Sequence, residues 1–98
     1  MTKTEALAVL RDHADELRRR GVSRAALFGS VARGDASPGS DLDILVELDP
    51  TARLDLFDYV GIVRFIEGLF PVQVDVADRE GLKPHMRSAA ERDAVYAF

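Results

Sequence analysis

Residues 27–46 read LFGSVARGDASPGSDLDILV and end in a regular alternation of acidic and apolar side chains. Asp41 and Asp43 stand two positions apart, and apolar residues fill the positions between and after them. A period of two predicts a β-strand over about residues 41–48, with the carboxylates on one face and the apolar row on the other. The Cα atoms of the two aspartates are then roughly 6.5 Å apart, close enough for the side chains to share divalent cations. Without a cation, the like charges repel each other.

Two other interpretations of the acidic pair compete with this one. Ser40 and Asp41 also suit a turn after Pro38 and Gly39, or a helix cap. A cap is followed by helical spacing, whereas here the period of two continues past Asp43, which excludes a cap. The remaining alternative is a solvated strand face. Leu45 lies on the same side as the aspartates, so we expect that face to be partly covered.

Gly29 and Ser30 end the apolar run that precedes the aspartates. Glycine has no Cβ, so the backbone can approach a ligand closely there. We expect Ser30 to cap a short helical turn over residues 31–33, whose free N–H groups would face a phosphate. Arg33 adds a cation, and Gly34 is placed to end the turn in the left-handed conformation. Such a turn alone is commonly only a turn, and its value comes from its fixed spacing to the aspartates.

A third carboxylate follows in residues 71–77, PVQVDVA. The valines alternate onto one face and leave Gln73 and Asp75 on the other. If this strand pairs beside the first acidic strand, Asp75 lies within about 5 Å of Asp43 as a cross-strand neighbour. The alternative is an aspartate at a strand exit, and spacing alone does not decide between the two.

Taken together, these motifs resemble the signature of the polymerase-β-like nucleotidyltransferase superfamily. The residues that carry the resemblance are Gly29, Ser30, Arg33, Gly34, Ser40, Asp41, Leu42 and Asp43. Within the superfamily the chain resembles the smallest branch, the minimal nucleotidyltransferases (MNT), which are typically the antitoxin partners of HEPN-domain toxins. Segments 49–54, 74–76 and 82–85 also look typical of this branch, so the resemblance covers almost the whole chain.

The resemblance implies the transfer of AMP from ATP to a tyrosine hydroxyl of a cognate HEPN toxin, which becomes inactive. It implies two Mg²⁺ ions, roughly 3.5–4 Å apart, as cofactors. Asp41 and Asp43 would hold the ion on the triphosphate side, and Asp43 and Asp75 the ion on the acceptor side. The resemblance thus makes Asp75 the third catalytic and metal-binding acid.

The resemblance also implies a nucleotide site and a protein partner. The nucleotide-binding residues would be Gly29, Ser30, Arg33 and Ser40. The chain would form a hetero-oligomer with its toxin. Two other kinds of function remain open: a non-catalytic antitoxin or nucleotide-binding regulatory module, and a small-molecule nucleotidyltransferase. The complete acidic set favours catalysis, because binding alone does not require it.

Composition agrees with a small enzyme domain over residues 1–98. The chain has 98 residues, of which 47% are hydrophobic and 31% charged, so it is neither disordered nor membranous in composition. Charges interrupt every long apolar stretch, and the first residues lack a secretory pattern, so a cytoplasmic location is expected. The absence of cysteine excludes disulfides and cysteine-ligated zinc. A net charge of −4 argues against direct nucleic-acid binding.

The order of predicted elements indicates an α/β (α+β) fold, a small mixed β-sheet flanked by helices, as in polymerase-β-like nucleotidyltransferases. Thr2 and Glu5 have capping-box spacing at the start of a first helix, which Gly21 is placed to end. Strands are expected near residues 25–29, 41–48 and 71–77. Further helices are expected over about residues 54–69 and 84–92, followed by an edge strand within residues 94–98.

The predicted helix over residues 54–69 has more apolar surface than one amphipathic stripe requires. The residues outside the stripe are Phe57, Ile62, Phe65 and Leu69. Either the helix is deeply packed, or it also meets a partner subunit.

Overall fold

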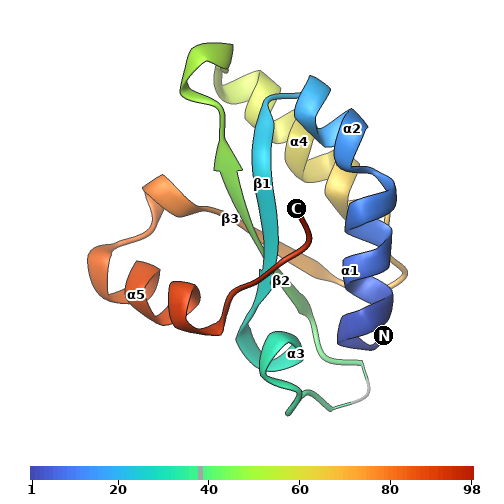
Figure 1. Cartoon of the computed structure of the whole chain (residues 1–98). Helices are drawn as coiled ribbons and strands as arrows, with labels where there is room; N and C mark the ends of the chain where they lie inside the picture. Colours follow the sequence, from blue (N-terminus) through green and yellow to red (C-terminus); the bar gives the residue numbers. More distant parts are fainter. Residues whose placement is uncertain (38) are drawn as a thin grey trace.

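A mixed β-sheet with strand order β3-β2-β1-β4 forms the centre of the computed structural model, which describes residues 1–37 and 39–98 (Figure 1). Its strands are β1 (Val22–Phe28), β2 (Leu42–Leu48), β3 (Val74–Asp78) and β4 (Val95–Tyr96). β1 pairs antiparallel with β2 and β4, whereas β2 and β3 run parallel. The predicted fold class is confirmed. Of the turn expected at Pro38 and Gly39, Pro38 lies outside the described residues.

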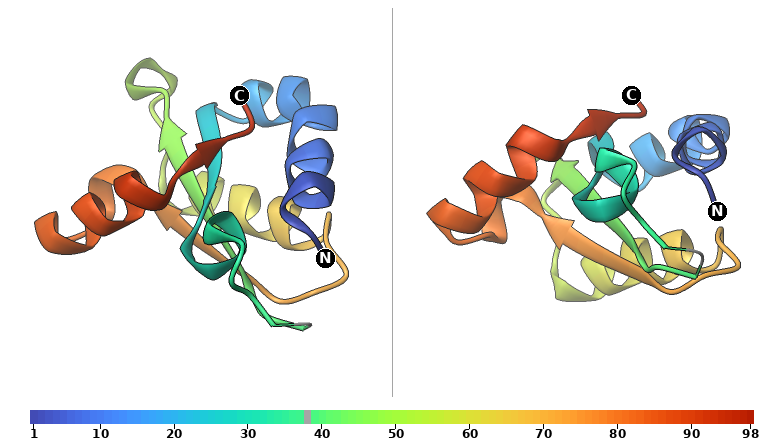
Figure 2. Two further views of the ribbon diagram at one scale, coloured as in Figure 1. Left: turned by 60° about the horizontal axis from the view of Figure 1, so that its bottom comes forward. Right: turned by 90° about the horizontal axis from the view of Figure 1, so that it is seen from below.

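Helices cover the two faces of the sheet unequally. They are α1 (Lys3–Asp12), α2 (Ala14–Arg19), α3 (Gly29–Arg33), α4 (Leu56–Glu67) and α5 (Pro84–Asp93), with short helical turns η1 (Pro50–Ala52) and η2 (Arg79–Gly81). α1, α2 and α4 lie on one side of the sheet and α5 on the other (Figures 1 and 2). No helix within residues 1–37 and 39–98 has the length and apolar character needed to cross a membrane.

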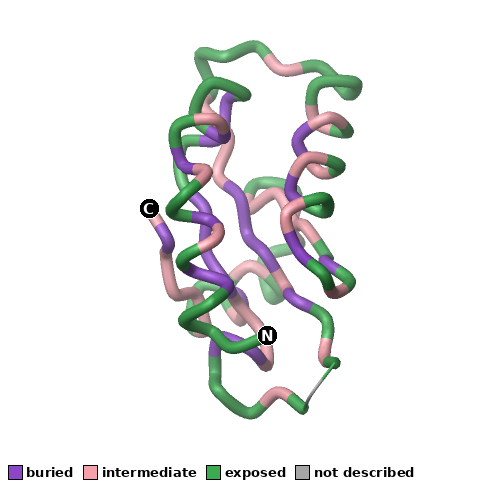
Figure 3. The backbone as a smooth tube through the Cα atoms, turned by 90° about the vertical axis from the view of Figure 1, so that its right-hand side faces the viewer, coloured by how far each residue is buried: buried purple, intermediate pink, exposed green. Residues whose placement is uncertain are grey.

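The main core fills the space between the sheet and the larger group of helices. Leu42, Ile44 and Val46 of β2 are fully buried there, as the two-residue period predicted. Buried residues follow the central strands and the inward sides of the helices (Figure 3). On the opposite face, Leu45 is only 1% exposed. The acidic face of β2 is therefore partly covered, as expected.

The N-terminal helix begins as predicted but does not continue to Gly21. The Glu5 N–H donates to Thr2 Oγ1 at 3.1 Å and the Thr2 N–H to Glu5 Oε1 at 2.9 Å, which completes the capping box. The helix breaks at His13, whose N–H bonds to the Leu10 carbonyl at 3.2 Å. The His13 ring nitrogen Nδ1 lies 2.8 Å from the Val9 carbonyl, which a continuous helix would offer to the backbone instead. The prediction of one uninterrupted helix was wrong for this reason.

The later elements lie close to their predicted positions. α4 is shorter than expected because Asp55 caps it, accepting a hydrogen bond from the Asp58 N–H at 2.8 Å. α5 begins at Pro84, as predicted, and β4 forms the expected edge strand beside β1.

The apolar surface of α4 divides between the core and the solvent. Ile62 is 1% exposed and belongs to the core, and Phe65 and Leu69 are half-buried. Leu56 and Phe57, by contrast, are 72% and 86% exposed. Packing in the core therefore accounts for Ile62 and in part for Phe65 and Leu69, and contact of this helix with a partner subunit stays a prediction.

Replacing Leu27 tests the core. Leu27 is fully buried between the sheet and the helices. Leu27→Ala is expected to lower the free energy of unfolding by about 2–5 kcal/mol through lost burial and a residual cavity. The exposed Phe57→Ala variant should stay within about 0.5 kcal/mol of the parent protein. Equal losses in urea unfolding of the two variants would contradict this assignment of the core.

Candidate active site

The parallel pairing of β2 with β3 brings two carboxylates together. Asp43 and Asp75 are direct register partners, on strands about 4.8 Å apart. The predicted cross-strand pair is therefore formed. Asp41 immediately precedes β2 and is exposed. All three acids lie at the end of the sheet where β1 leads into α3, because Phe28 of β1 pairs with Asp43.

The surroundings of Asp43 disfavour its charged form. Partial burial raises its pKa, and the charges of Asp75 and Asp41 raise it further, while Arg33 opposes the shift. In the part of the chain that the structure describes, no side-chain or backbone donor hydrogen-bonds to these three carboxylates. The acids therefore form a negatively charged region without a hydrogen-bonded donor, whose charge a bound cation would neutralise.

Gly29 lets the backbone pass directly against Asp43. Its φ is +72°, in the left-handed region. A Cβ built on Gly29 would overlap Asp43 Oδ2 and lie 3.1 Å from Asp43 Cγ. The close approach expected for this glycine is thus present, and the approaching group is the acidic strand itself.

The turn after Gly29 differs in one respect from the prediction. α3 starts at Gly29, and its capping position is occupied by Phe28, with no side-chain hydrogen bond. Ser30 is therefore inside the helix and does not cap it, because the strand continues directly into the first helical residue. Gly34 ends α3 with φ +81°, as predicted.

The two remaining predicted nucleotide-binding residues lie on either side of the loop between α3 and β2. Arg33 Nη1 donates to Asp93 Oδ2 at 2.8 Å, and Arg33 Nε donates to Asp35 Oδ2 at 3.2 Å. Ser40 is half-buried directly before Asp41, and its N–H bonds to the Ser37 carbonyl at 3.0 Å. The structure thus gathers the predicted residues around one end of the sheet, and their roles stay predictions.

The donor set suits Mg²⁺, which prefers carboxylate oxygens. Asp43 and Asp75 offer adjacent carboxylates, and the neighbouring Gly29 leaves no side chain between the α3 turn and Asp43. Among the described residues, no group of three or more His, Cys, Asp or Glu side chains is already arranged to hold a metal ion. The fit to Mg²⁺ therefore rests on the paired carboxylates and the charge of Asp41.

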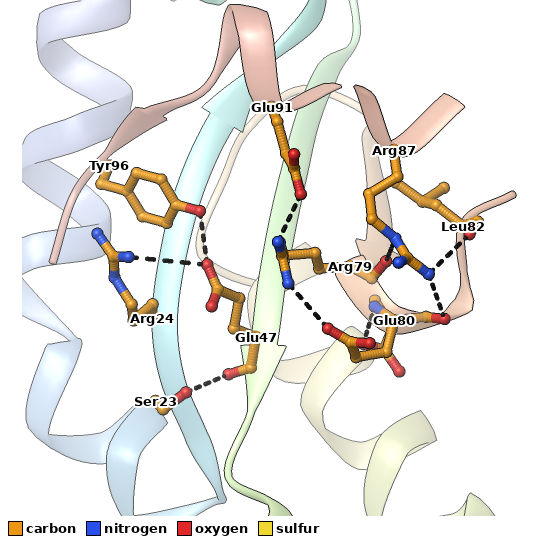
Figure 4. Close-up of polar contacts among 10 residues, drawn as sticks. Ser23, Arg24, Glu47, Arg79, Glu80, Leu82, Arg87, Glu91 and Tyr96 are labelled. Carbon is orange, nitrogen blue, oxygen red and sulfur yellow. Dashed lines mark hydrogen bonds and ion pairs between the residues drawn. The ribbon is translucent and has the colours of Figure 1, made fainter. Parts of the chain in front are cut away.

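A second polar cluster continues along the same face of β2 (Figure 4). Tyr96 Oη donates to Glu47 Oε2 at 2.5 Å, and Arg24 Nη1 lies 4.0 Å from that oxygen. Nearby, Arg79 Nη2 lies 2.6 Å from Glu91 Oε1. These contacts connect β4 to β2 and η2 to α5, so α5 is held beside the acidic face of the sheet.

The sequence analysis missed this cluster and the partner of Arg33. Glu47 carried a signal, because it continues the two-residue period that starts at Asp41. Asp93 carried none, since it lies 60 residues from Arg33 in the chain.

Comparisons with known proteins agree with this architecture. Residues 10–97 match the family model of the nucleotidyltransferase domain. The protein adenylyltransferase MntA of Thermococcus cleftensis is 33% identical over 97 residues, covering 98% of this chain and 96% of the relative. A solved structure described as a minimal nucleotidyltransferase is 35% identical with a TM-score of 0.71, covering 97% of this chain and 95% of the other.

A more distant neighbour adds a likeness of fold alone. It is a tri-AMPylated Shewanella oneidensis HEPN toxin in complex with an MNT antitoxin, at 16% identity and a TM-score of 0.65. The match covers 94% of this chain and 71% of the other. The chain therefore belongs to the nucleotidyltransferase domain family, with the fold of the minimal nucleotidyltransferases. It is a nucleotidyltransferase.

Removing the Asp43 charge is expected to stabilise the protein at neutral pH. The folded protein holds the Asp43 proton more tightly than the unfolded chain, because the pKa is raised. The ionised carboxyl therefore destabilises the fold above that raised pKa, and this effect disappears as the pH falls through it towards the ordinary aspartate range. In EDTA, Asp43→Asn should raise the midpoint of thermal unfolding by about 1–4 °C at pH 7.

The control is Asp12→Asn, which alters an exposed acid on α1. Mg²⁺ should raise the midpoint of the parent and Asp12→Asn proteins but not that of Asp43→Asn. A stabilising effect of Asp43→Asn that persisted unchanged at pH 3 would contradict burial and like-charge repulsion as its cause.

Proposed function

We propose that this protein is an antitoxin that transfers AMP from ATP to a tyrosine hydroxyl of a cognate HEPN toxin and so inactivates it. The observation that carries the proposal is the pairing of Asp43 with Asp75 beside the Gly29 turn. The similarity to the protein adenylyltransferase MntA supports AMP as the transferred group and a protein as the acceptor. The likeness to a HEPN toxin and MNT antitoxin complex motivates the choice of partner.

The proposed reaction is an in-line displacement at the α-phosphorus of ATP. The phenolic oxygen of the toxin forms a bond to the α-phosphorus, and the bond from that phosphorus to the bridging oxygen of the β-phosphate breaks. Pyrophosphate leaves, and the phenolic proton passes to solvent. The product is an AMP ester on the tyrosine.

The three aspartates would together hold two metal ions. Asp41 and Asp43 would hold the triphosphate-side Mg²⁺, and Asp43 and Asp75 the acceptor-side Mg²⁺. When bound, the two ions would stabilise the charge that develops on the attacking and leaving oxygens. Asp43 takes part in both positions, which is consistent with its place between the other two acids.

The triphosphate would lie at the turn after β1. The backbone at Gly29 and the Ser30 hydroxyl would contact the β- and γ-phosphates, with Arg33 and Ser40 at the edges of the site. Since Ser30 does not cap α3, its hydroxyl remains available for this role. A cytoplasmic location belongs to the same proposal, because the cytoplasm supplies ATP.

To place a tyrosine at the acidic face, the toxin must also bind to a second surface of this chain. Leu56, Phe57 and Val60 form an exposed apolar patch at the start of α4. We assign this patch to partner contact in place of the set expected from sequence, because Ile62 belongs to the core.

The first test of this function is the loss of transfer in Asp43→Asn. Removing a carboxylate that serves both ion positions should lower the rate by about 100-fold or more. The measurement is mass spectrometry of the toxin after co-expression, which detects added AMP. Asp12→Asn is the control and should transfer normally. Wild-type transfer by Asp43→Asn would refute the two-ion assignment.

Asp75→Asn separates binding from chemistry. Its proposed ion serves the acceptor, so the variant should lose turnover while its affinity for ATP, measured by calorimetry, changes by less than about threefold. Equal losses of affinity and turnover would remove Asp75 from the acceptor side.

Transfer is also expected to depend on the folded partner. Orientation of donor and acceptor can lower a barrier by about 7–11 kcal/mol, so a free tyrosine peptide should be a very poor acceptor. Phe57→Ala should slow labelling of the folded toxin and leave the weak labelling of the peptide unchanged. Similar rates with peptide and toxin would instead indicate a stand-alone small-molecule transferase.

A further inference from the structure

Arg33 is held between two carboxylates that belong to different parts of the chain. Asp35 follows it in the next loop, and Asp93 is the last residue of α5. The Asp93 contact is the shorter, at 2.8 Å against 3.2 Å. The Asp93 side chain is also less exposed, 26% against 60% for Asp35. Because solvent screens the more exposed pair more strongly, Asp93 is the main determinant of where the guanidinium lies.

Asp93 occupies an unfavourable place for its charge. The C-terminal end of a helix carries a partial negative charge, so an aspartate in its last turn is repelled by the helix dipole. Among the described ion pairs, the partner of Asp93 is the guanidinium of Arg33 on α3, outside its own helix. The position is therefore poor for the stability of α5 and suitable for holding an arginine.

The charge of the held arginine acts on the acidic end of the sheet. Arg33 is the one cation that lowers the pKa of Asp43 in the described structure, so its charge acts at that carboxylate. Asp93 uses one Nη1 hydrogen and Asp35 uses Nε, which leaves further N–H groups of the planar guanidinium available to a ligand. A guanidinium fixed on two sides can present those donors to a phosphate with little loss of side-chain freedom.

We infer that Asp93 is a positioning residue, which fixes the Arg33 guanidinium at the end of α3, the helix that begins at Gly29, so that its remaining donors meet the triphosphate. This inference rests on the proposed function, because it assumes that the triphosphate lies at the turn after β1. Asp93 does not touch the substrate and acts through Arg33. Since α5 and β4 are consecutive, the inference also ties the C-terminal segment to the nucleotide site.

The experiment is calorimetric titration of the chain with the magnesium complex of AMP-PNP. Asp93→Asn should weaken binding about two- to fivefold, the range expected for a partly exposed ion pair. Arg33→Ala should weaken it more. In the Arg33→Ala background, adding Asp93→Asn should change nothing further, because its effect passes through the missing guanidinium.

Two controls distinguish positioning from a structural role. Glu91→Gln removes another α5 carboxylate, which pairs with Arg79 instead, and should leave the affinity unchanged. Asp93→Asn should not lower the thermal midpoint, since removing its charge relieves the repulsion at the helix end. In turnover assays with the toxin, Asp93→Asn should raise KM for ATP with kcat nearly unchanged.

The possible outcomes separate this inference from the proposed function. Parent-like affinity in Asp93→Asn, or an equal loss in the Arg33→Ala background, overturns the inference and leaves the proposed function standing. A similar loss in Glu91→Gln overturns it as well, because general loosening of α5 then explains the effect. Failure of the parent protein to bind AMP-PNP overturns both.

Discussion

Repulsion between the carboxylates of Asp43 and Asp75 is the constraint on which the site depends. Parallel pairing of β2 with β3 fixes these residues side by side, and partial burial adds to the energetic penalty of charging Asp43. The cause lies in the apolar half of β2, where Leu42, Ile44 and Val46 are fully buried. Their burial offsets the repulsion, because a strand that commits one face to the core must present the alternate residues together on the other.

Helices cover the two faces of the sheet unequally because one face is apolar and the other is acidic. α1, α2 and α4 pack on the apolar face, whereas α5 lies across the acidic one (Figure 2). α5 is anchored at its C-terminal end by two ion pairs: Arg79 with Glu91, and Arg33 with Asp93. Leu45 and Ala90 are buried on this face. The acidic face is therefore bordered by α5, whose ion pairs hold it beside the end of the sheet that carries the aspartates.

Local patterns in the sequence predicted much of this arrangement. The capping box at Thr2, the left-handed Gly34 and the alternation around Asp43 depend on neighbours within a few residues, so they are visible in the sequence. The break at His13 was missed because it depends on a side chain taking a backbone acceptor. The division of the α4 surface was missed because periodicity shows an apolar face without showing what covers it. The catalytic and binding roles themselves remain predictions.

Arg33 shows that the positively charged part of such a site is held in place differently from the negatively charged part. A nucleoside triphosphate brings negative charge, and its divalent ions bring positive charge, so the protein must offer regions of both signs within a short distance. The aspartates are fixed by backbone register, which leaves them little freedom. A long arginine side chain on a five-residue helix has no such constraint, and needs partners such as Asp93 to restrict it. The Gly29 turn lies between the two regions, and the absence of a side chain there allows opposite charges to approach one ligand.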